Sequence, residues 1–535
     1  MKVTKVSYDH IHQFSKRDHQ YTQESESFGE FIQYPFEYEA FSAVLADRQK
    51  YPIDRALLKR VVISQYAGLK ISKATQRHLD SMEDSNFFTV TTAHQPSLLT
   101  GPLYYVFKIL SSIRLAQRLS EDFPSYKVAP VFVIGGEDHD FEEINHLHLY
   151  GKQVAWKNDG KGSVGRFDTA GLSAVLTEVG DILGKDAKTA ELLKELNEHL
   201  NQSKSYGEFS FRMTHTLFDE LGLIILRMDE PELKAAFSDH IQKELTQELS
   251  ADYVRKTQAK IKEELGYGEQ AHVRDINLFY TGGGARDRIE KSDNTYQVVG
   301  TEKQFSEAEI LDELRDHPEH FSPNVVMRPL YQETILPNLA YIGGGGELAY
   351  WTERKSQFEA YGLPFPMLVR RQSGMILTER HSKSLDKLSL GIQDLFMTEH
   401  RLSDHLISIL DTEDYSMEAH KEKLSHLFAQ ITEKVIAIDK SLEKTSLAEE
   451  VKAMKSLDHL ENKMKKSIKQ KEEINLNRAK KLQKGLFPKG LQERHDNILQ
   501  YIATYGVSLI QDLLPYCDPF DKNFKVFMPQ SKSET

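Results

Sequence analysis

Two polar segments follow predicted strands, and their side chains are the ones from which we expect chemistry. The first is "TAHQPSLLTGP", which holds His94, Gln95, Thr100 and Gly101 and leads into a helical pattern that contains Lys108. A loop that enters a helix offers backbone amides to an anion, and glycine lets the backbone approach that anion closely. The loop therefore predicts a binding site for a phosphate or carboxylate group. The alternative is a well-capped helix start with a hydrogen-bonded histidine.

The second segment, "GGEDHDFEEINH", directly follows the next predicted strand and contains four ionisable residues in succession: Glu137, Asp138, His139 and Asp140. A buried carboxylate is strongly unfavourable unless it is paired, so such a set favours substrate binding or acid–base catalysis over a role in folding. One alternative is a solvated helix cap. Another is a metal site, which requires a helix that starts near Asp140 and brings the histidines and glutamates of residues 139–146 to one face. We expect no metal here.

A third segment, "SPNVVMRPLYQETILPNLAYIGGGGELAYW", alternates turn residues with apolar ones. Its arginine and glutamine are four residues apart and face one pocket if this stretch is helical. Four consecutive glycines then precede a helical pattern, and a purely structural turn seldom needs so much backbone freedom. A flexible connector is the alternative. The residues that we expect to bind substrate or nucleotide here are Arg328, Gln332, Gly343, Gly344, Gly346, Glu347 and Tyr350.

Two further features favour structural roles. The segment "YTGGGARDR" (residues 280–288) predicts a tight turn between edge strands. Cys517 is the only cysteine of the chain, which excludes an intrachain disulfide framework and a cysteine-rich zinc site. A lone thiol without a basic neighbour is usually inert, so we expect Cys517 to be structural.

The elements that must position these residues form an α/β pattern. A strand at Phe87–Ala93, a helix at Leu103–Leu119 and a strand at Val128–Gly136 make a βαβ unit, hence a parallel pair with a right-handed crossover. Further strands are expected at Leu221–Asp229, Ala271–Asp275, Asn294–Gly300 and Pro364–Arg371. We therefore predict a doubly wound parallel sheet over residues 86–375, with inserted segments at about 151–205 and 230–320.

The flanking regions differ in character from this core. Residues 1–85 predict a mostly helical segment that packs on it. Residues 376–490 are rich in Lys and Glu, carry apolar residues at spacings of three and four, and predict a coiled-coil arm of two long antiparallel helices. Ser446 and Glu449 have the spacing of a capping box. The arm either packs only within the chain or also dimerises. Residues 491–535 predict a final helix and a tail, with a last strand in "DPFDKNFKVF", that return to the core.

Composition narrows the functional classes. The chain has 535 residues and a net charge of −12, which disfavours binding to nucleic acid. No run of about 18 apolar residues occurs, and the amino terminus lacks the apolar stretch of a signal peptide. We therefore expect a soluble, cytoplasmic protein that binds no membrane.

Four segments, in this order, resemble the family of cysteine-adding enzymes of bacillithiol biosynthesis: "HQPSLLTGPLYYVFK", "GEDHDFEEINH", "SPNVVMRPLYQETILPNLAYIGGGGELAYW" and "LFPKGLQER". The resemblance covers essentially the whole chain, including the arm and the "DPFD" tail. Two departures stand out. The family commonly has Gly where this chain has Ala93, and Gly-Gly-Pro-Gly where this chain has Gly343 to Gly346; both leave access to the backbone largely intact.

The resemblance implies a ligase that joins the carboxyl group of cysteine to the amine of glucosaminyl malate. It also implies a Rossmann-like core, similar to that of class I aminoacyl-tRNA synthetases, and a coiled-coil arm that forms a homodimer. Because that core normally activates a carboxylate with ATP, we infer ATP as a co-substrate. His94, Gln95 and the segment 100–102 occupy the place of the synthetases' His-Ile-Gly-His signature, although the match is one of position only.

From these implications we assign roles as hypotheses. His94, the Thr100–Gly101 turn and Lys108 meet phosphate charge. Acidic residues of the segment 137–140 bind ammonium groups, with His139 or Asp140 as the base. Arg328 binds the carboxylates of malate. Two rival readings are a nucleotidyltransferase or phosphate-ester hydrolase on the same fold, and a non-catalytic nucleotide-binding coiled-coil scaffold.

Overall fold

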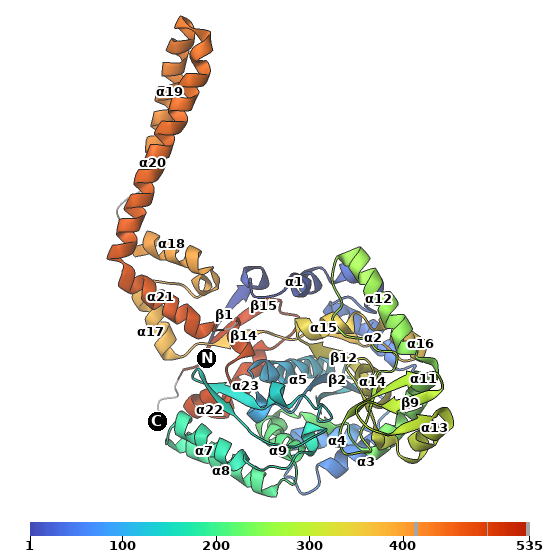
Figure 1. Ribbon diagram of the computed structural model, residues 1–535. Coiled ribbons are helices and arrows are strands. Elements are labelled where there is room, and N and C mark those ends of the chain that lie inside the picture. Colours follow the sequence, from blue (N-terminus) through green and yellow to red (C-terminus); the bar gives the residue numbers. More distant parts are fainter. Residues whose placement is uncertain (411–415, 489, 531–535) are drawn as a thin grey trace. The chain divides into compact units, whose positions relative to one another are not determined.

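The computed structural model describes residues 1–410, 416–488 and 490–530. The chain divides into two compact units, one of Met1–Leu377 with Lys489–Thr535 and one of Thr378–Pro488 (Figure 1). The first unit contains the α/β core, and the second consists of helices. Each is described by itself below.

A five-stranded sheet, all of whose strand pairs are parallel, forms the centre of the first unit, which confirms the predicted Rossmann-like α/β class. Its order is β13-β12-β2-β3-β6. The bounds are β2 Phe87–His94, β3 Lys127–Ile134, β6 Ile224–Arg227, β12 Asn338–Gly343 and β13 Met367–Arg370. The crossover helix α5, Tyr104–Asp122, lies beside β2 and β3 (Figure 1). Ala271–Asp275 was expected to be a strand and is not one.

The strand order creates a switch point. The chain runs from β2 outward to β3 and β6, then returns to the other side of β2 with β12 and β13. In open α/β sheets, ligands bind outside the carboxyl ends of the strands where the order reverses. The expected place for a ligand is therefore between the ends of β2 and β12, with β3 alongside.

The sequence explains why these strands are central. Strand β2, "FFTVTTAH", is aromatic and β-branched and is buried along almost its whole length, as both faces of a parallel sheet require. The outer edge of β6 is closed by side chains from the end of helix α3, Arg55–Gln65. The Ile225 amide donates to the Tyr66 hydroxyl (2.8 Å), and the Arg227 amide donates to Gln65 Oε1 (2.9 Å). This edge is thus not open to another strand.

Two long insertions interrupt the core. The first follows β3 and contains a hairpin and four α-helices: α6 Phe141–Ile144, β4 His146–Leu149, β5 Lys152–Ala155, α7 Leu172–Leu183, α8 Ala187–Gln202 and α9 Tyr206–Phe218. The second follows β6 and contains helices α10 Pro231–Ala236, α11 Ser238–Gln247, α12 Leu249–Leu265, α13 Glu307–Asp316 and α14 Arg328–Ile335. It also contains an antiparallel sheet of order β10-β9-β8-β7-β11. Its strands are β7 Leu278–Tyr280, β8 Asp287–Ser292, β9 Thr295–Val298, β10 Gln304–Ser306 and β11 Phe321–Pro323.

The two ends of the chain meet in a third sheet. Strand β15, Asn523–Met528, pairs antiparallel with β1, Lys2–Ser7, and parallel with β14, Gly374–Ile376. The last strand was predicted, but β1 falls in the segment predicted to be helical, because its partner is contributed from the far end of the chain. The rest of that segment is mostly helical, with α1 Lys16–Gln23, α2 Phe41–Arg48, α3 and α4 Lys73–Ser81. The expected final helix is broken at Gly506 into α22 Leu499–Tyr505 and α23 Ser508–Leu513.

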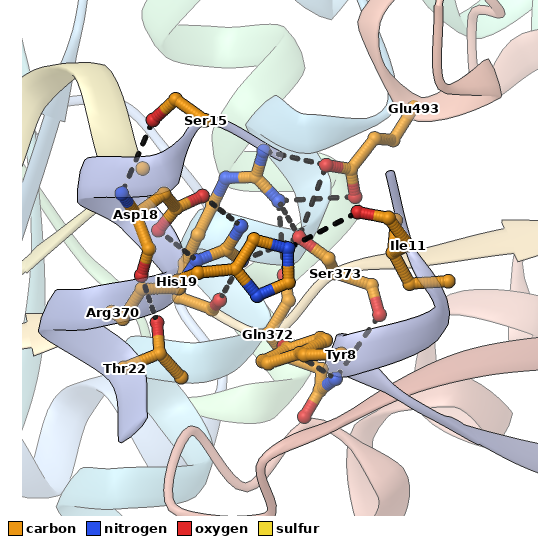
Figure 2. A network of polar contacts seen from close by, with 12 residues as sticks. Tyr8, Ile11, Ser15, Asp18, His19, Thr22, Arg370, Gln372, Ser373 and Glu493 are labelled. Atoms are coloured by element: carbon orange, nitrogen blue, oxygen red, sulfur yellow. Dashed lines mark hydrogen bonds and ion pairs between the residues drawn. The ribbon is translucent and has the colours of Figure 1, made fainter. Parts of the chain in front are cut away.

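A buried polar network fastens these segments to the core (Figure 2). Arg370, at the end of β13, donates to both carboxylate oxygens of Asp18 on α1, at 3.2 and 2.9 Å. Glu493 accepts hydrogen bonds from the Ser373 hydroxyl and the Gly374 amide, both at 3.0 Å. Charged groups that are this deeply buried are tolerated only when they are paired. The network therefore joins residues from the start, the middle and the end of the chain.

The second unit consists of α17 Glu379–Leu388, α18 Glu399–Leu410, α19 Glu418–Ile438, α20 Glu443–Lys471 and α21 Glu473–Leu486. Helices α19 and α20 are antiparallel, since Ser425 bonds Glu450 and Thr432 bonds Ser446. The predicted capping box is wrong: α20 begins three residues before Ser446, which lies inside the helix and faces α19. Within the described ranges, no helix has the length and apolar character needed to span a membrane.

Candidate active site

A cavity of about 770 Å³ opens at the switch point, within the usual size range of small-molecule sites. His94 and Gln95 at the end of β2, Asp138 after β3 and the glycine loop after β12 all line it. The Gly135 amide donates to the His94 carbonyl (2.8 Å), and Gln95 Nε2 donates to Asp138 Oδ2 (2.9 Å). The first two sequence motifs thus meet around one cavity, as their parallel strands predicted.

Asp138 is surrounded by donors and cations. Besides Gln95, it accepts the His139 amide (2.9 Å), and its oxygens lie 3.7 Å from Arg286 Nη1 and 4.0 Å from Arg328 Nη1. Burial alone raises the pKa of Asp138, but Arg328, the Gln95 hydrogen bond and Arg286 together hold it below its ordinary value. Asp138 is therefore an ionised group with two guanidinium groups close by.

Glu137 is engaged in a buried ion pair. Its Oε1 lies 2.6 Å from Lys234 Nζ, which also donates to the Phe321 carbonyl (2.9 Å). Burial raises the pKa of Glu137, but the Lys234 ammonium outweighs it and keeps the pKa below its ordinary value. Both side chains are almost fully buried, so Glu137 acts as the counter-ion of Lys234 and is poorly suited to carry a proton. No sequence motif pointed to Lys234, which lies on α10 in the second insertion.

His139 is oriented by an arginine from the second insertion. Arg286 Nη1 donates to His139 Nδ1 (3.0 Å), so the neutral imidazole carries its proton on Nε2, which lies 3.7 Å from Asp140 Oδ1. Arg286 is held in turn by the Ser322 hydroxyl (3.0 Å) and the Pro323 carbonyl (3.2 Å). It belongs to the segment "YTGGGARDR", which joins the antiparallel strands β7 and β8; these are inner strands of their sheet and not the edge strands that were predicted. The segment also supplies a residue of the cavity.

His94 is present as the neutral imidazole. Its Nδ1 donates to the Gln95 carbonyl (2.9 Å) and its Nε2 lies 3.2 Å from the Tyr104 hydroxyl. Burial, followed by the nearby Lys108 ammonium, lowers the pKa of His94 to about 4. His94 therefore orients the loop and contributes no positive charge to a bound anion near neutral pH.

Four of the residues predicted to bind substrate or nucleotide lie outside this cavity. Thr100, Gly101, Lys108 and Gly343 do not line the cavity. The helix begins at Tyr104, and the Gly101 amide donates to the Leu98 carbonyl (2.8 Å), so this amide is not available to an anion. Lys108 is fully buried behind the glycine loop, where its Nζ contacts the Ala93 carbonyl and lies 2.7 Å from Glu347 Oε1.

The third motif supplies another wall of the cavity. Helix α14 turns Arg328 and Gln332 toward it, and helix α15, Gly345–Trp351, adds Glu347 and Tyr350. Gly344 and Gly346 also line it. Between them, Gly345 has to be glycine, because a Cβ there would lie 2.3 Å from the Asp18 carboxyl carbon. The glycine loop therefore packs closely against Asp18 of the buried network in Figure 2.

Three more arginines line the cavity that sequence reasoning did not single out: Arg274, Arg371 and Arg494. Arg371 donates to both oxygens of Glu493, at 3.1 and 2.8 Å, and its Nε faces Gly344. Arg494 lies in the segment "LFPKGLQER", for which no chemical role was predicted. With Arg286 and Arg328, these residues make the cavity rich in donors for carboxylate and phosphate groups.

Taken together, the parallel sheet, the arginine-lined cavity at its switch point and the separate unit of long antiparallel helices define a Rossmann-like enzyme core with a helical arm. The family model described as "Bacillithiol biosynthesis BshC, N-terminal Rossmann-like domain" matches residues 1–372. The model described as "Bacillithiol biosynthesis BshC, C-terminal coiled-coil domain" matches residues 374–528. The chain therefore belongs to the BshC family of bacillithiol biosynthesis, and the predicted ligase class is confirmed at this level.

Relatives of known name agree with this assignment. A protein of Christiangramia forsetii named "Putative cysteine ligase BshC" is 38% identical over 535 residues, which cover 98% of this chain and 99% of the relative. A protein of the same name from Flavobacterium johnsoniae is 38% identical and covers 88% of this chain and 89% of its own length. The protein of this name from Bacillus cereus is 28% identical and covers 90% and 93%, respectively.

Proposed function

We propose that the protein joins the carboxyl group of cysteine to the amine of glucosaminyl malate and thereby forms bacillithiol. The relatives carry the name cysteine ligase, and their family belongs to bacillithiol biosynthesis. The observation that carries the proposal is the convergence of Gln95, Asp138, Arg286 and Arg328 on one cavity at the switch point. Arg371, which lies beside the glycine loop, lines the same cavity and offers further donors to a carboxylate or phosphate group.

ATP is proposed as the co-substrate, because amide formation in water needs an activated carboxyl. A carboxylate oxygen of cysteine attacks the α-phosphorus of ATP, and pyrophosphate leaves. The amine nitrogen then attacks the acyl carbon of the adenylate, and AMP leaves. Arg371, Arg494 and Gly344–Gly346 line the cavity, which supports the proposal that they meet phosphate charge in place of the Thr100–Gly101 turn expected from the sequence.

Glucosaminyl malate, the second substrate, is bound by the positively and negatively charged groups around Asp138. Among the described residues, Arg328 contacts a partner only through its 4.0 Å ion pair with Asp138, so its N–H groups are available to a carboxylate of malate. Asp138 and Asp140 suit the ammonium groups of cysteine and the amino sugar. We assign proton removal from the attacking amine to Asp140, because the His139 nitrogen that lacks a proton already accepts from Arg286.

The test is direct. Purified protein is mixed with cysteine, glucosaminyl malate and ATP, and mass spectrometry follows the coupled thiol together with AMP and ADP. The proposal predicts coupled thiol and AMP in equal amounts. Asp138→Asn abolishes both and keeps the fold, whereas the exposed control Asp159→Asn leaves both unchanged. Pyrophosphate without an amine acceptor would favour the nucleotidyltransferase or hydrolase, and no turnover at all would favour the scaffold.

A homodimer through the arm is part of the proposal. The hairpin of α19 and α20 leaves large apolar side chains exposed, among them Leu427, Leu447 and Val451, at 51%, 47% and 53% of their full area. Such a row on one hairpin is typical of an interface between chains. The double variant Leu447→Ser/Val451→Ser is expected to convert a dimer into a monomer by light scattering. An unchanged mass would count against this interface. A cytoplasmic location stays a prediction.

A further inference from the structure

A cluster of histidine and glutamate lies outside the cavity, at the end of helix α13 in the second insertion. His317 ends that helix, and Glu319 and His320 lie in the 3₁₀ turn of residues 318–320, just before β11. Their metal-ligating atoms all lie within 4.8 Å of one another. Two imidazoles and one carboxylate are a ligand set that divalent transition metals favour.

The distances fit a shared ion after small side-chain rotations. Glu319 Oε1 lies 3.2 Å from His317 Nδ1 and 3.9 Å from His320 Nε2. Bonds of about 2.0–2.2 Å to one metal separate neighbouring ligand atoms by roughly 3.0–3.5 Å. The two imidazole rings are nearly parallel, with an interplanar angle of 18° and centroids 4.7 Å apart, so both already point along one side of the turn.

A second carboxylate prepares His320 to act as a ligand. His320 Nδ1 lies 2.7 Å from Glu313 Oε1, which also accepts from the Tyr280 hydroxyl (2.6 Å). Because the Glu313 oxygen accepts this contact from Nδ1, the other ring nitrogen, Nε2, is left on the side of Glu319. A carboxylate that orients a histidine in this way is the usual support of a metal ligand.

The charge around the cluster also suits a cation. The described part of the chain holds one other group of this kind, Asp138 with His139 and Asp140, where Arg286 and Arg328 lie 3.7 and 4.0 Å from Asp138. Glu319, in contrast, is ion-paired only with the two histidines among the described residues. No arginine is ion-paired with these described ligands, and the Lys303 ammonium lies one contact further away, on the Tyr280 hydroxyl that donates to Glu313.

We propose that His317, Glu319 and His320 bind one divalent transition-metal ion of the zinc class, with Glu313 as the positioning residue. The remaining coordination positions face solvent, since about half of the His317 side chain is exposed. The ion would tie the end of α13 to β11, whose Ser322 and Pro323 hold Arg286. It would thus stabilise the strand that supports the cavity without taking part in the reaction.

The experiment titrates full-length protein, first stripped with a chelator, with Zn²⁺ in competition with a chromophoric chelator, and records the visible spectrum of the Co²⁺ form. We expect one tight site that His317→Ala, Glu319→Gln and His320→Ala each remove. Glu313→Gln retains the site but weakens it about 10–100-fold, as loss of an orienting carboxylate does. Asp316→Asn, which removes the same charge one residue from His317, leaves the affinity unchanged.

Three outcomes would overturn the proposal. One is wild-type Zn²⁺ binding in His317→Ala, a variant at an exposed position whose fold is checked by circular dichroism. Another is a loss of binding in His139→Ala alone, which would place the ion at the cavity. The third is equal weakening by Glu313→Gln and Asp316→Asn, which would show only a general effect of charge.

Discussion

Replacing Arg286 by methionine is expected to lower the ligation activity strongly while changing the free energy of unfolding only slightly. The side chain is 2% exposed and lies with its guanidinium carbon 3.8 Å from the Phe279 ring centroid. Burial, followed by the neighbouring Arg328, lowers the pKa of Arg286 from 12.5 to about 10. At 1.36 kcal/mol per pKa unit, the charged form is disfavoured in the folded protein by about 3 kcal/mol. The protein therefore holds this cation at the site against a cost in stability.

Loss of the guanidinium removes its hydrogen bonds to Ser322 and Pro323. Hydrogen bonds from a charged donor contribute about 1.5–3 kcal/mol each. This loss roughly offsets the relief of the buried charge, so the free energy of unfolding of Arg286→Met should stay within about 2 kcal/mol of the wild type. Ligation should fall about 100-fold in kcat/KM, because His139 and Asp138 lose the group that orients them.

The assay pairs urea unfolding with ligation kinetics, and Arg288→Met serves as the control. Arg288 lies two residues away and is partly exposed, in a weak ion pair with Glu290. The control should keep both stability and activity. If Arg286→Met unfolded several kcal/mol more easily and lost activity only in proportion, Arg286 would be a structural residue. Activity within threefold of the wild type would remove its role in the site.

Three further predictions concern buried groups. Burial raises the pKa of Glu333 from 4.5 to about 7. The contribution of Glu333 to the free energy of unfolding is therefore present below pH 4.5 and is lost as pH rises through 7. Glu333→Gln should reduce the change in the free energy of unfolding across this pH window by about 3 kcal/mol. Glu493→Gln leaves the buried Arg371 without its bidentate partner and should lower the free energy of unfolding in urea by about 3 kcal/mol. Burial raises the pKa of the Cys517 thiol, which should therefore resist a thiol reagent in the native protein and react once urea unfolds it.

A specific result would contradict each of these three predictions. A pH slope that is unchanged in Glu333→Gln would assign that slope to other groups. A wild-type urea midpoint for Glu493→Gln, matching the exposed control Glu379→Gln, would show that the network of Figure 2 contributes little. Rapid labelling of Cys517 without urea would show that its surroundings open in the native state.

The sequence predicted the parts of the fold that depend on local pattern. Strands β2 and β3 are apolar runs joined by one amphipathic helix, so their parallel pairing followed, and with it the meeting of Gln95 and Asp138. Strand β1 escaped prediction because its alternation is weak and its partner, β15, is distant in sequence. Local periodicity carries no information on such long-range pairing.

Only those residues of the site that belong to a recognisable sequence motif were predicted. Arg286 and Lys234 lie in ordinary turn and helix sequences of the second insertion, and their roles arise from contacts with residues about 100 or more positions away. The prediction that the Thr100–Gly101 turn binds an anion did not hold for a local reason. The backbone has positive φ at residues 99–101, the helix begins only at Tyr104, and the Gly101 amide donates to the Leu98 carbonyl. Residue type thus indicated polarity correctly, whereas the direction of each group depended on the tertiary fold.

A crystal structure with a stable sulfamoyl analogue of cysteinyl adenylate tests the central claim most directly, namely that the reaction centre is the cavity at the switch point. We predict that the analogue lies in this cavity, with its cysteinyl ammonium near Asp138 or Asp140 and its adenylate portion beside Gly344–Gly346 and Arg371. An analogue bound elsewhere on the protein while this cavity stays empty would contradict the claim.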